Sequence, residues 1–155
     1  MDRAHGIALR YFERHEPALS AARRACQARG YFTLFPETPD RHPGGASAAD
    51  AGRAAFAAQL GRRFELPQPG TIGRLAGEVS PYTQEPLGID YPRADPDALF
   101  TAAREAMGPW AAAPARARLG VCMEIVDRLH AGVFEAAQAG MHTAGQGGAQ
   151  SYART

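Results

Sequence analysis

The sequence predicts a mainly helical protein with one short β-ribbon. Alanine-rich segments carry apolar residues at three- and four-residue spacing, and capping residues stand at several of their ends. Prolines and glycines confine any strand to the middle of the chain. These observations predict four main helices, near residues 17–29, 48–60, 96–107 and 114–131, and a ribbon between the second and the third.

The first helix is predicted in the stretch EPALSAARRACQARG, residues 16–30. Pro17 suits a first helical turn, and Gly30 suits the left-handed residue that follows a helix. The preceding stretch IALRYFERH can form a further turn or two, and we expect Pro17 to break or bend the helix there. Cys26 lies on the apolar face, which predicts a buried structural thiol.

The second helix is predicted to begin at about residue 48, because Ser47 and Asp50 form an S-x-x-D capping pattern. Its apolar face is mostly alanine with Phe56 and Leu60, so it buries little area and is expected to pack on something larger. Strands are predicted near 75–79 and 86–91, joined by a turn at SPYTQEP. A two-stranded ribbon is marginal alone and needs a neighbour to pack upon.

The third helix is predicted to begin after the N-cap residue Asp95, with Pro96 in its first turn, and to stop at Gly108-Pro109. The fourth helix carries the strongest amphipathic pattern of the chain. Its apolar positions are Leu119, Cys122, Met123, Val126 and Leu129. These positions predict the core face, so Cys122 is expected to be buried, and we expect this helix to pack against the third through Leu99, Ala103, Leu119, Met123 and Val126. A break at Gly132 and another short helix in VFEAAQAGMHTAG are expected to follow.

The charge and composition exclude several function classes. The formal net charge of +1 gives no field that favours nucleic acid or an anionic membrane, so neither is expected as a partner. Lysine is absent from the sequence, which excludes a Schiff-base lysine, a P-loop lysine and a lysine general base. The chain has no stretch of about 18 apolar residues and no signal-peptide pattern, so a soluble, cytoplasmic protein is expected.

Sequence patterns predict no catalytic, cofactor-binding or metal-binding residue in this chain. The histidines are His5, His15, His42, His130 and His142, and none stands at metal-ligand spacing from another or from a cysteine. The GQGG run at residues 145–148 lacks the context of a dinucleotide fingerprint. A small-molecule site at His142 or His130 is an alternative hypothesis.

The order of the predicted elements resembles the N-terminal part of the aldehyde dehydrogenase superfamily. The resemblance lies in GEVSPYTQEPLGIDYPRADPDALFTAAREAMGPWAAAPARARLGVCMEIVDRLHAGVFEAAQAGMHTAGQ, residues 77–146. An Ala-x-x-Ala helix ending near a tryptophan corresponds to Ala98–Trp110, and an arginine-containing helix follows it, from Arg116 or Arg118 through Leu129. Within the superfamily, ARGYFTLFPETP, FELPQPGTIGRLAGEVSPY and MHTAGQ are similar to the branch of the phenylacetic acid degradation protein PaaN.

The resemblance implies an enzyme that oxidises an aldehyde with NAD or NADP through a cysteine hemithioacetal, with an oxyanion-stabilising asparagine and a glutamate base. In the family these positions and the cofactor lysine lie downstream of residues 1–155. The resemblance therefore implies the helical N-terminal portion of an aldehyde dehydrogenase-like α/β fold without its cofactor-binding sheet. A truncated gene product, a frameshift and a genuine short paralogue would each give such a chain.

The expected domain organisation follows from the resemblance to aldehyde dehydrogenases. Residues 1–70 are expected to form a helical N-terminal extension, residues 71–146 the ribbon and first helices of the dehydrogenase domain, and residues 147–155 a disordered tail. Expected partners are the remaining dehydrogenase portion or a second copy of the chain. The alternative is a non-catalytic helical interaction module that binds a dehydrogenase subunit or itself.

Overall fold

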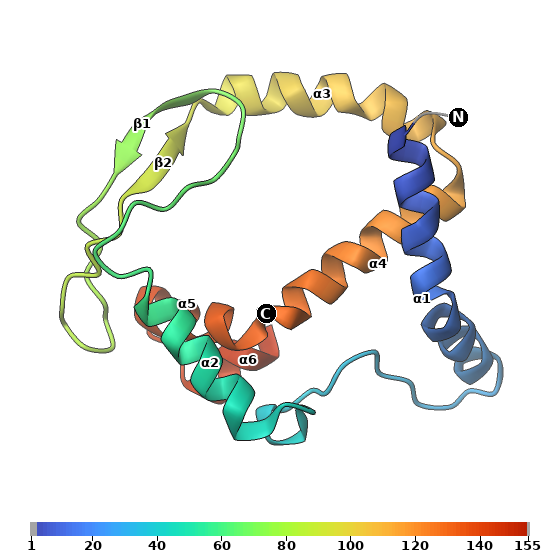
Figure 1. The fold of residues 1–155 in the computed structure, drawn as a ribbon, viewed down its shortest axis with the longest axis horizontal. Coiled ribbons are helices and arrows are strands. Elements are labelled where there is room, and N and C mark those ends of the chain that lie inside the picture. The colour runs from blue at the N-terminus through green and yellow to red at the C-terminus, as the bar shows by residue number, and fades with distance from the viewer. Residues whose placement is uncertain (1–2, 155) are drawn as a thin grey trace. The chain divides into compact units, whose positions relative to one another are not determined.

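A computed structural model describes residues 3–154, which are mainly helical with one two-stranded antiparallel sheet, as the sequence predicts. Figure 1 shows the elements in chain order. They are α1 (Arg3–Gln27), the 3-10 turn η1 (Pro39–Arg41), α2 (Gly45–Ala57), β1 (Thr71–Leu75), β2 (Tyr91–Ala94), α3 (Pro96–Ala112), α4 (Ala115–Ala131), α5 (Val133–Ala144) and α6 (Gly148–Arg154). Among the helices of these residues, none combines the length and the hydropathy needed to cross a membrane.

The chain divides into two compact units that are discontinuous in sequence. Unit 1 combines the chain up to Glu37 with Gly108–Ala131, and unit 2 combines Thr38–Met107 with the chain from Gly132 onward. The expected boundary at residue 70 falls inside unit 2 and does not coincide with this division. The physical reason is that each unit is built around a pair of helices far apart in sequence, α1 with α4 and α2 with α5.

Unit 1 is built on close contact between α1 and α4. Ala8 of α1 and Ala117 of α4 are buried, and Gly120 of α4 lies directly against the α1 backbone. A Cβ atom at Gly120 would overlap the carbonyl oxygen of Ala8 and the amide nitrogen of Phe12. Small side chains therefore set the distance between these two helices, because any larger group would push them apart.

The helix α1 begins earlier than the sequence predicts and ends at Gln27, two residues before the predicted end. Pro17 lies inside α1, so the expected helix boundary at this residue is wrong. Pro17 removes the hydrogen bond to the carbonyl of Glu13, but Glu13 is exposed and water can solvate that carbonyl. The end of α1 is a Schellman motif, with Gly30 N bonded to Ala25 O at 2.8 Å. Its left-handed residue is Arg29, at φ 52°, and Gly30 follows it.

Unit 2 is built on the pairing of α2 with α5, and α6 packs on α5 (Figure 1). One cluster of buried side chains contains Phe56, Leu87 and Ile89, and a second contains Val133, Ala137 and Tyr152. Burial of each large apolar side chain contributes about 1.5–3 kcal/mol. Phe56 has the core position that the sequence predicts, whereas Leu60, the other large apolar residue of the predicted face, is 40% exposed.

The start of α2 differs from the expected capping box. The N-cap is Gly44 and no side chain caps this end, so the prediction that Ser47 begins the helix is wrong. Asp50 instead pairs with Arg53 one turn later, at 2.8 Å. Gly45, the first residue of α2, lies three residues before the predicted start and has a φ of 49°, a left-handed conformation that glycine adopts without strain.

The ribbon has the predicted turn but different strands. Ser80 N donates to Glu85 O at 2.9 Å and Gln84 N donates to Ser80 O at 2.8 Å, which closes the turn in SPYTQEP. The regular strands are β1 and β2, with Leu75 opposite Tyr91, and an isolated antiparallel bridge joins Val79 to Pro86. The expected pairing of 75–79 with 86–91 is therefore present at its two ends, but the continuous strands lie beyond it. Gly77, at a φ of 98°, interrupts the first expected strand.

The helix α3 begins as predicted and ends later. Asp97 N donates to Asp95 Oδ1 at 3.1 Å, which confirms Asp95 as the N-cap. Gly108-Pro109 does not stop the helix, because α3 includes Pro109 and continues to Ala112. No residue of α3 is buried, so the carbonyl that Pro109 leaves unbonded can be hydrated. The division between the two units nevertheless falls between Met107 and Gly108.

The partner of α4 and the structure of the C-terminal tail also differ from expectation. The residues of α4 match the prediction and Gly132 separates α4 from α5, but α4 pairs with α1 and not with the third helix. The tail is not disordered over residues 148–154, where α6 buries Ser151 and Tyr152 against α5. Tyr152 joins a core cluster, and the aromatic contact with Phe134 explains why this glycine-rich sequence is ordered.

Candidate functional site

A cluster of charged side chains lies between α1 and α4 in unit 1. Glu124 is 5% exposed, and its Oε2 accepts from Arg14 Nη1 at 2.9 Å and from His15 Nε2 at 3.1 Å. Its Oε1 accepts from Arg128 Nε at 2.9 Å, one turn along α4. Arg128 Nη2 also donates to the hydroxyl of Tyr11 at 3.2 Å. Both oxygens of this buried carboxylate are therefore hydrogen-bonded, which offsets the cost of burying its charge.

These contacts lower the pKa of Glu124 below its ordinary value. The largest cause is the hydrogen bond from His15, and the hydrogen bond and charge of Arg128 and the charge of Arg14 act in the same direction, whereas burial opposes them. Glu124 in turn raises the pKa of Arg128, chiefly through their hydrogen bond. The carboxylate therefore stays ionised at neutral pH.

We expect Glu124→Gln to lower the melting temperature at pH 7 by roughly 5–10 °C, because glutamine cannot pair with two arginines and a histidine. A depressed folded pKa gives stability that is present above the unfolded pKa and is lost as the pH falls through the folded pKa. The wild-type chain should therefore lose stability on acidification from about pH 5 downward more steeply than the variant.

Thermal melts from pH 7 to pH 3 measure this difference. Asp50→Asn is the control, because the Asp50–Arg53 pair is exposed and contributes little. Parallel pH profiles for the wild-type chain and for Glu124→Gln would contradict the assignment.

Part of the same cluster resembles a metal site. Ligand atoms of His15, Glu124 and Asp127 lie within 4.8 Å of one another. Sequence spacing could not reveal this group, because His15 and Glu124 are 109 residues apart. Arg14 and Arg128 already occupy the carboxylate oxygens that a cation would need. The arrangement favours a structural ion cluster, and the absence of a metal ligand from this chain stays a prediction.

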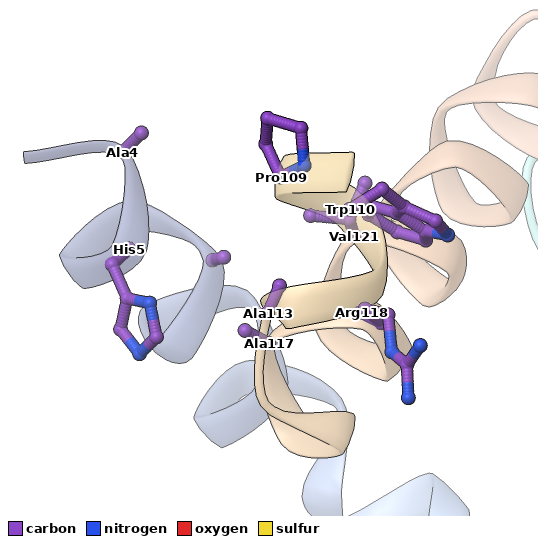
Figure 2. A pocket seen from close by; sticks show the side chains of 9 residues that line it. Ala4, His5, Pro109, Trp110, Ala113, Ala117, Arg118 and Val121 are labelled. Atoms are coloured by element: carbon purple, nitrogen blue, oxygen red, sulfur yellow. The ribbon is translucent and has the colours of Figure 1, made fainter. Parts of the chain in front are cut away.

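A pocket of about 550 Å³ opens in unit 1 beside α1, the end of α3 and the start of α4 (Figure 2). Its lining consists of Ala4, His5, Ala8, Pro109, Trp110, Ala113, Ala117, Arg118 and Val121. None of the described lining residues has a carboxylate, thiol or hydroxyl side chain, and His5 is the described residue there that can transfer a proton. Figure 2 shows alanine side chains along much of the wall, so the pocket can accommodate apolar groups but holds no catalytic constellation.

In unit 2, Ser80 and His142 make the contact expected of a nucleophile and its base, but Ser80 lacks the access to solvent that a nucleophile needs. Ser80 Oγ lies 3.0 Å from His142 Nδ1, and it also accepts from the backbone amides of Tyr82 and Thr83. Ser80 is completely buried, so no substrate reaches it. The ring of His142 stacks on Phe56 at 4.8 Å between ring centroids. These contacts hold the ribbon turn against the core of unit 2.

The other histidine of the alternative hypothesis also contacts an aromatic ring. His130 stacks on Phe35 with the ring centroids 3.9 Å apart. Like His142, it therefore has a packing contact that accounts for its position, and neither histidine lines the pocket of unit 1. The structure favours a structural role for both.

Both cysteines are exposed, so the prediction of two buried thiols is wrong. The buried face of α4 consists of Ala117, Gly120 and Glu124, and Cys122 lies on a different face. The predicted core face was selected by hydrophobicity, whereas small residues decide which face can approach α1. Neither thiol has a described hydrogen-bonding partner that could act as its base.

A comparison with solved structures finds a likeness to an aldehyde dehydrogenase. The chain is similar to the NAD-dependent aldehyde dehydrogenase from Burkholderia multivorans, with 40% sequence identity and a TM-score of 0.78. The match covers 92% of this chain and 25% of that chain, so the chain spans a quarter of the length of the dehydrogenase. No family model and no curated protein matches the chain. The likeness supports the aldehyde dehydrogenase superfamily that the sequence resembles.

Proposed function

We propose that this chain is the N-terminal segment of a PaaN-type NAD(P)-dependent aldehyde dehydrogenase of phenylacetate degradation, and that it does not oxidise aldehydes by itself. One observation carries the proposal: 92% of the chain matches only 25% of a dehydrogenase at 40% identity. The finer assignment to the PaaN branch rests on the three quoted stretches that are similar to that branch.

The composition supports a non-catalytic role for this segment. The sequence contains no asparagine and no lysine. It therefore cannot supply the oxyanion-stabilising asparagine or the cofactor lysine that the resemblance implies. The described residues also place no base beside either cysteine, and an unactivated thiol is a poor nucleophile near neutral pH. The chemistry must come from another part of the polypeptide or from a partner.

The role that remains is that of a scaffold. The paired helices and the ribbon are held by buried side chains and by the ion cluster around Glu124, all of which stabilise the fold. NAD or NADP would bind to the remainder of the enzyme, and so would the aldehyde. A segment of this kind contributes to activity by completing the folded enzyme.

A chimera tests the proposal. In it, the matched quarter of the Burkholderia multivorans dehydrogenase is replaced by this chain. The purified chain, mixed with an aldehyde and NAD or NADP, should give no increase in absorbance from reduced cofactor. The chimera should give an increase in absorbance from reduced cofactor, because the scaffold is then joined to the catalytic residues. The dehydrogenase without its matched quarter is the control, and turnover by the isolated chain would refute the proposal.

A stand-alone interaction module is the second candidate function. The observation that favours it is the number of large apolar side chains left exposed, among them Phe100 at 67% and Met107 at 66%. Such a module would associate with a dehydrogenase subunit or with itself. Sedimentation of the isolated chain together with the intact Burkholderia multivorans dehydrogenase tests it, and two separately sedimenting species would count against it.

A further inference from the structure

The helix α4 presents two different faces within unit 1. Its buried face, Ala117, Gly120 and Glu124, packs against α1. Two residues after each of these positions stand Leu119, Cys122 and Val126. Two residues correspond to about 200° of rotation in an α-helix, so this second set lies on the opposite side from α1.

The opposite side is apolar and exposed. We define the outer stripe of α4 as Leu119, Cys122, Ile125, Val126 and Leu129. The exposed fractions are 41% for Leu119, 53% for Ile125, 42% for Val126 and 52% for Leu129, and Cys122 is also exposed. These residues follow one another at helical spacing over three turns. A helix with apolar residues on two opposite faces is typical of one buried on both sides.

We propose that the outer stripe of α4 is the docking surface for the part of an aldehyde dehydrogenase polypeptide that lies outside the segment matched by this chain. The inference rests on the proposed function and names the surface through which the segment would join the enzyme. The occupant follows from the comparison, because three quarters of the similar dehydrogenase have no counterpart here.

A second copy of the chain is a poorer occupant. The exposed surface of these side chains is on the order of a few hundred Å², whereas a stable interface buries about 800 Å² on each partner. The stripe alone is therefore too small for a stable dimer. The longer dehydrogenase chain needs no separate interface area, because a covalently continuous segment docks at a high effective concentration.

The reactivity of Cys122 tests the proposal directly, with Cys26 as an internal control. Both thiols are exposed in the isolated chain, so iodoacetamide should alkylate both. Trypsin then releases Cys122 in LGVCMEIVDR and Cys26 in ACQAR, because the chain contains arginine and no lysine. Mass spectrometry of the two peptides gives a separate rate for each thiol.

In the chimera with the Burkholderia multivorans dehydrogenase, alkylation of Cys122 should slow by about tenfold or more relative to Cys26, because docking covers the stripe. Val126→Asp places a charge on the stripe, so it should restore the reactivity of Cys122 in the chimera and leave the melting temperature of the isolated chain unchanged.

Other outcomes overturn the proposal. If Cys122 is protected in the isolated chain and the protection increases with protein concentration, a second copy of the chain is the occupant. If the protection does not depend on concentration, another part of the same chain is the occupant. An unchanged Cys122 rate in a chimera that oxidises aldehyde rejects the docking surface and leaves the proposed function intact. A chimera that protects Cys122 without oxidising aldehyde rejects the proposed function and retains the surface.

Discussion

Replacing Gly120 by alanine is expected to destabilise unit 1 by about 3 kcal/mol. The added Cβ would overlap backbone atoms of Ala8 and Phe12, and backbone atoms cannot rotate away as a flexible side chain does. The helices α1 and α4 must then separate, which also weakens the hydrogen bond between His15 and Glu124. Urea unfolding followed by circular dichroism measures the change.

Gly6→Ala is the matched control for this substitution. Gly6 lies in the same unit and also in a helix, but its added Cβ would meet only the guanidinium end of Arg10, at 3.8 Å. We expect this variant to be more stable by about 0.5–1 kcal/mol, because alanine favours a helix over glycine. Equal stabilities of Gly120→Ala and Gly6→Ala would show that α1 and α4 are not in close contact.

Replacing Gly52 by alanine is expected to destabilise unit 2 by a similar amount, about 3 kcal/mol. The added Cβ would overlap the Cβ of Phe134 and the backbone nitrogen of Glu135, so α2 could not keep its contact with α5. The displacement of Phe134 would also disturb Tyr152, which anchors α6. Loss of protection from hydrogen exchange in α6 is therefore an expected second effect.

Gly73→Ala is the control for unit 2, because a Cβ there would meet no other atom within 4 Å. Its unfolding midpoint should stay close to that of the wild-type chain. Hydrogen exchange in α1 and α4 should remain unchanged in Gly52→Ala, since those helices belong to unit 1. Loss of protection in α1 before α6 would contradict the assignment of Gly52 to the α2–α5 contact.

Local sequence signals predicted the elements that depend on neighbouring residues. Asp95 caps α3, Gly132 separates two helices, and the turn in SPYTQEP closes with backbone hydrogen bonds. Each of these features is determined within a few residues, which explains why spacing and residue type were sufficient. Proline was less informative, because the helices continue through Pro17 and Pro109 where the unbonded carbonyl can be hydrated.

Tertiary pairing was not predictable from the same signals. The strongest apolar pattern, that of α4, was assigned to the core, although the structure buries the face with Ala117 and Gly120. Close packing of two helix backbones requires small residues, and hydrophobicity alone does not detect this requirement. The apolar residues of this pattern form the exposed outer stripe, whereas the sequence-based prediction assigned them to a contact with the third helix.

The ion cluster was also beyond the reach of sequence patterns. His15 and Glu124 belong to helices separated by most of the chain, so no motif spacing connects them. Glu124 falls on the same helix face as two small residues, Ala117 and Gly120. A carboxylate buried on that face must be paired, but the sequence does not show which residues pair with it.

Under the proposed function, this chain supplies the scaffold of an aldehyde dehydrogenase and none of its catalytic groups. The most direct test is the rate of aldehyde-dependent NADH formation by the chimera in which Cys26 and Cys122, the only cysteines of this chain, are both replaced by alanine. The expected rate is within about threefold of that of the unsubstituted chimera, because under the proposed function neither thiol takes part in the chemistry. Loss of turnover at an unchanged melting temperature would contradict it and would place the nucleophile in this chain.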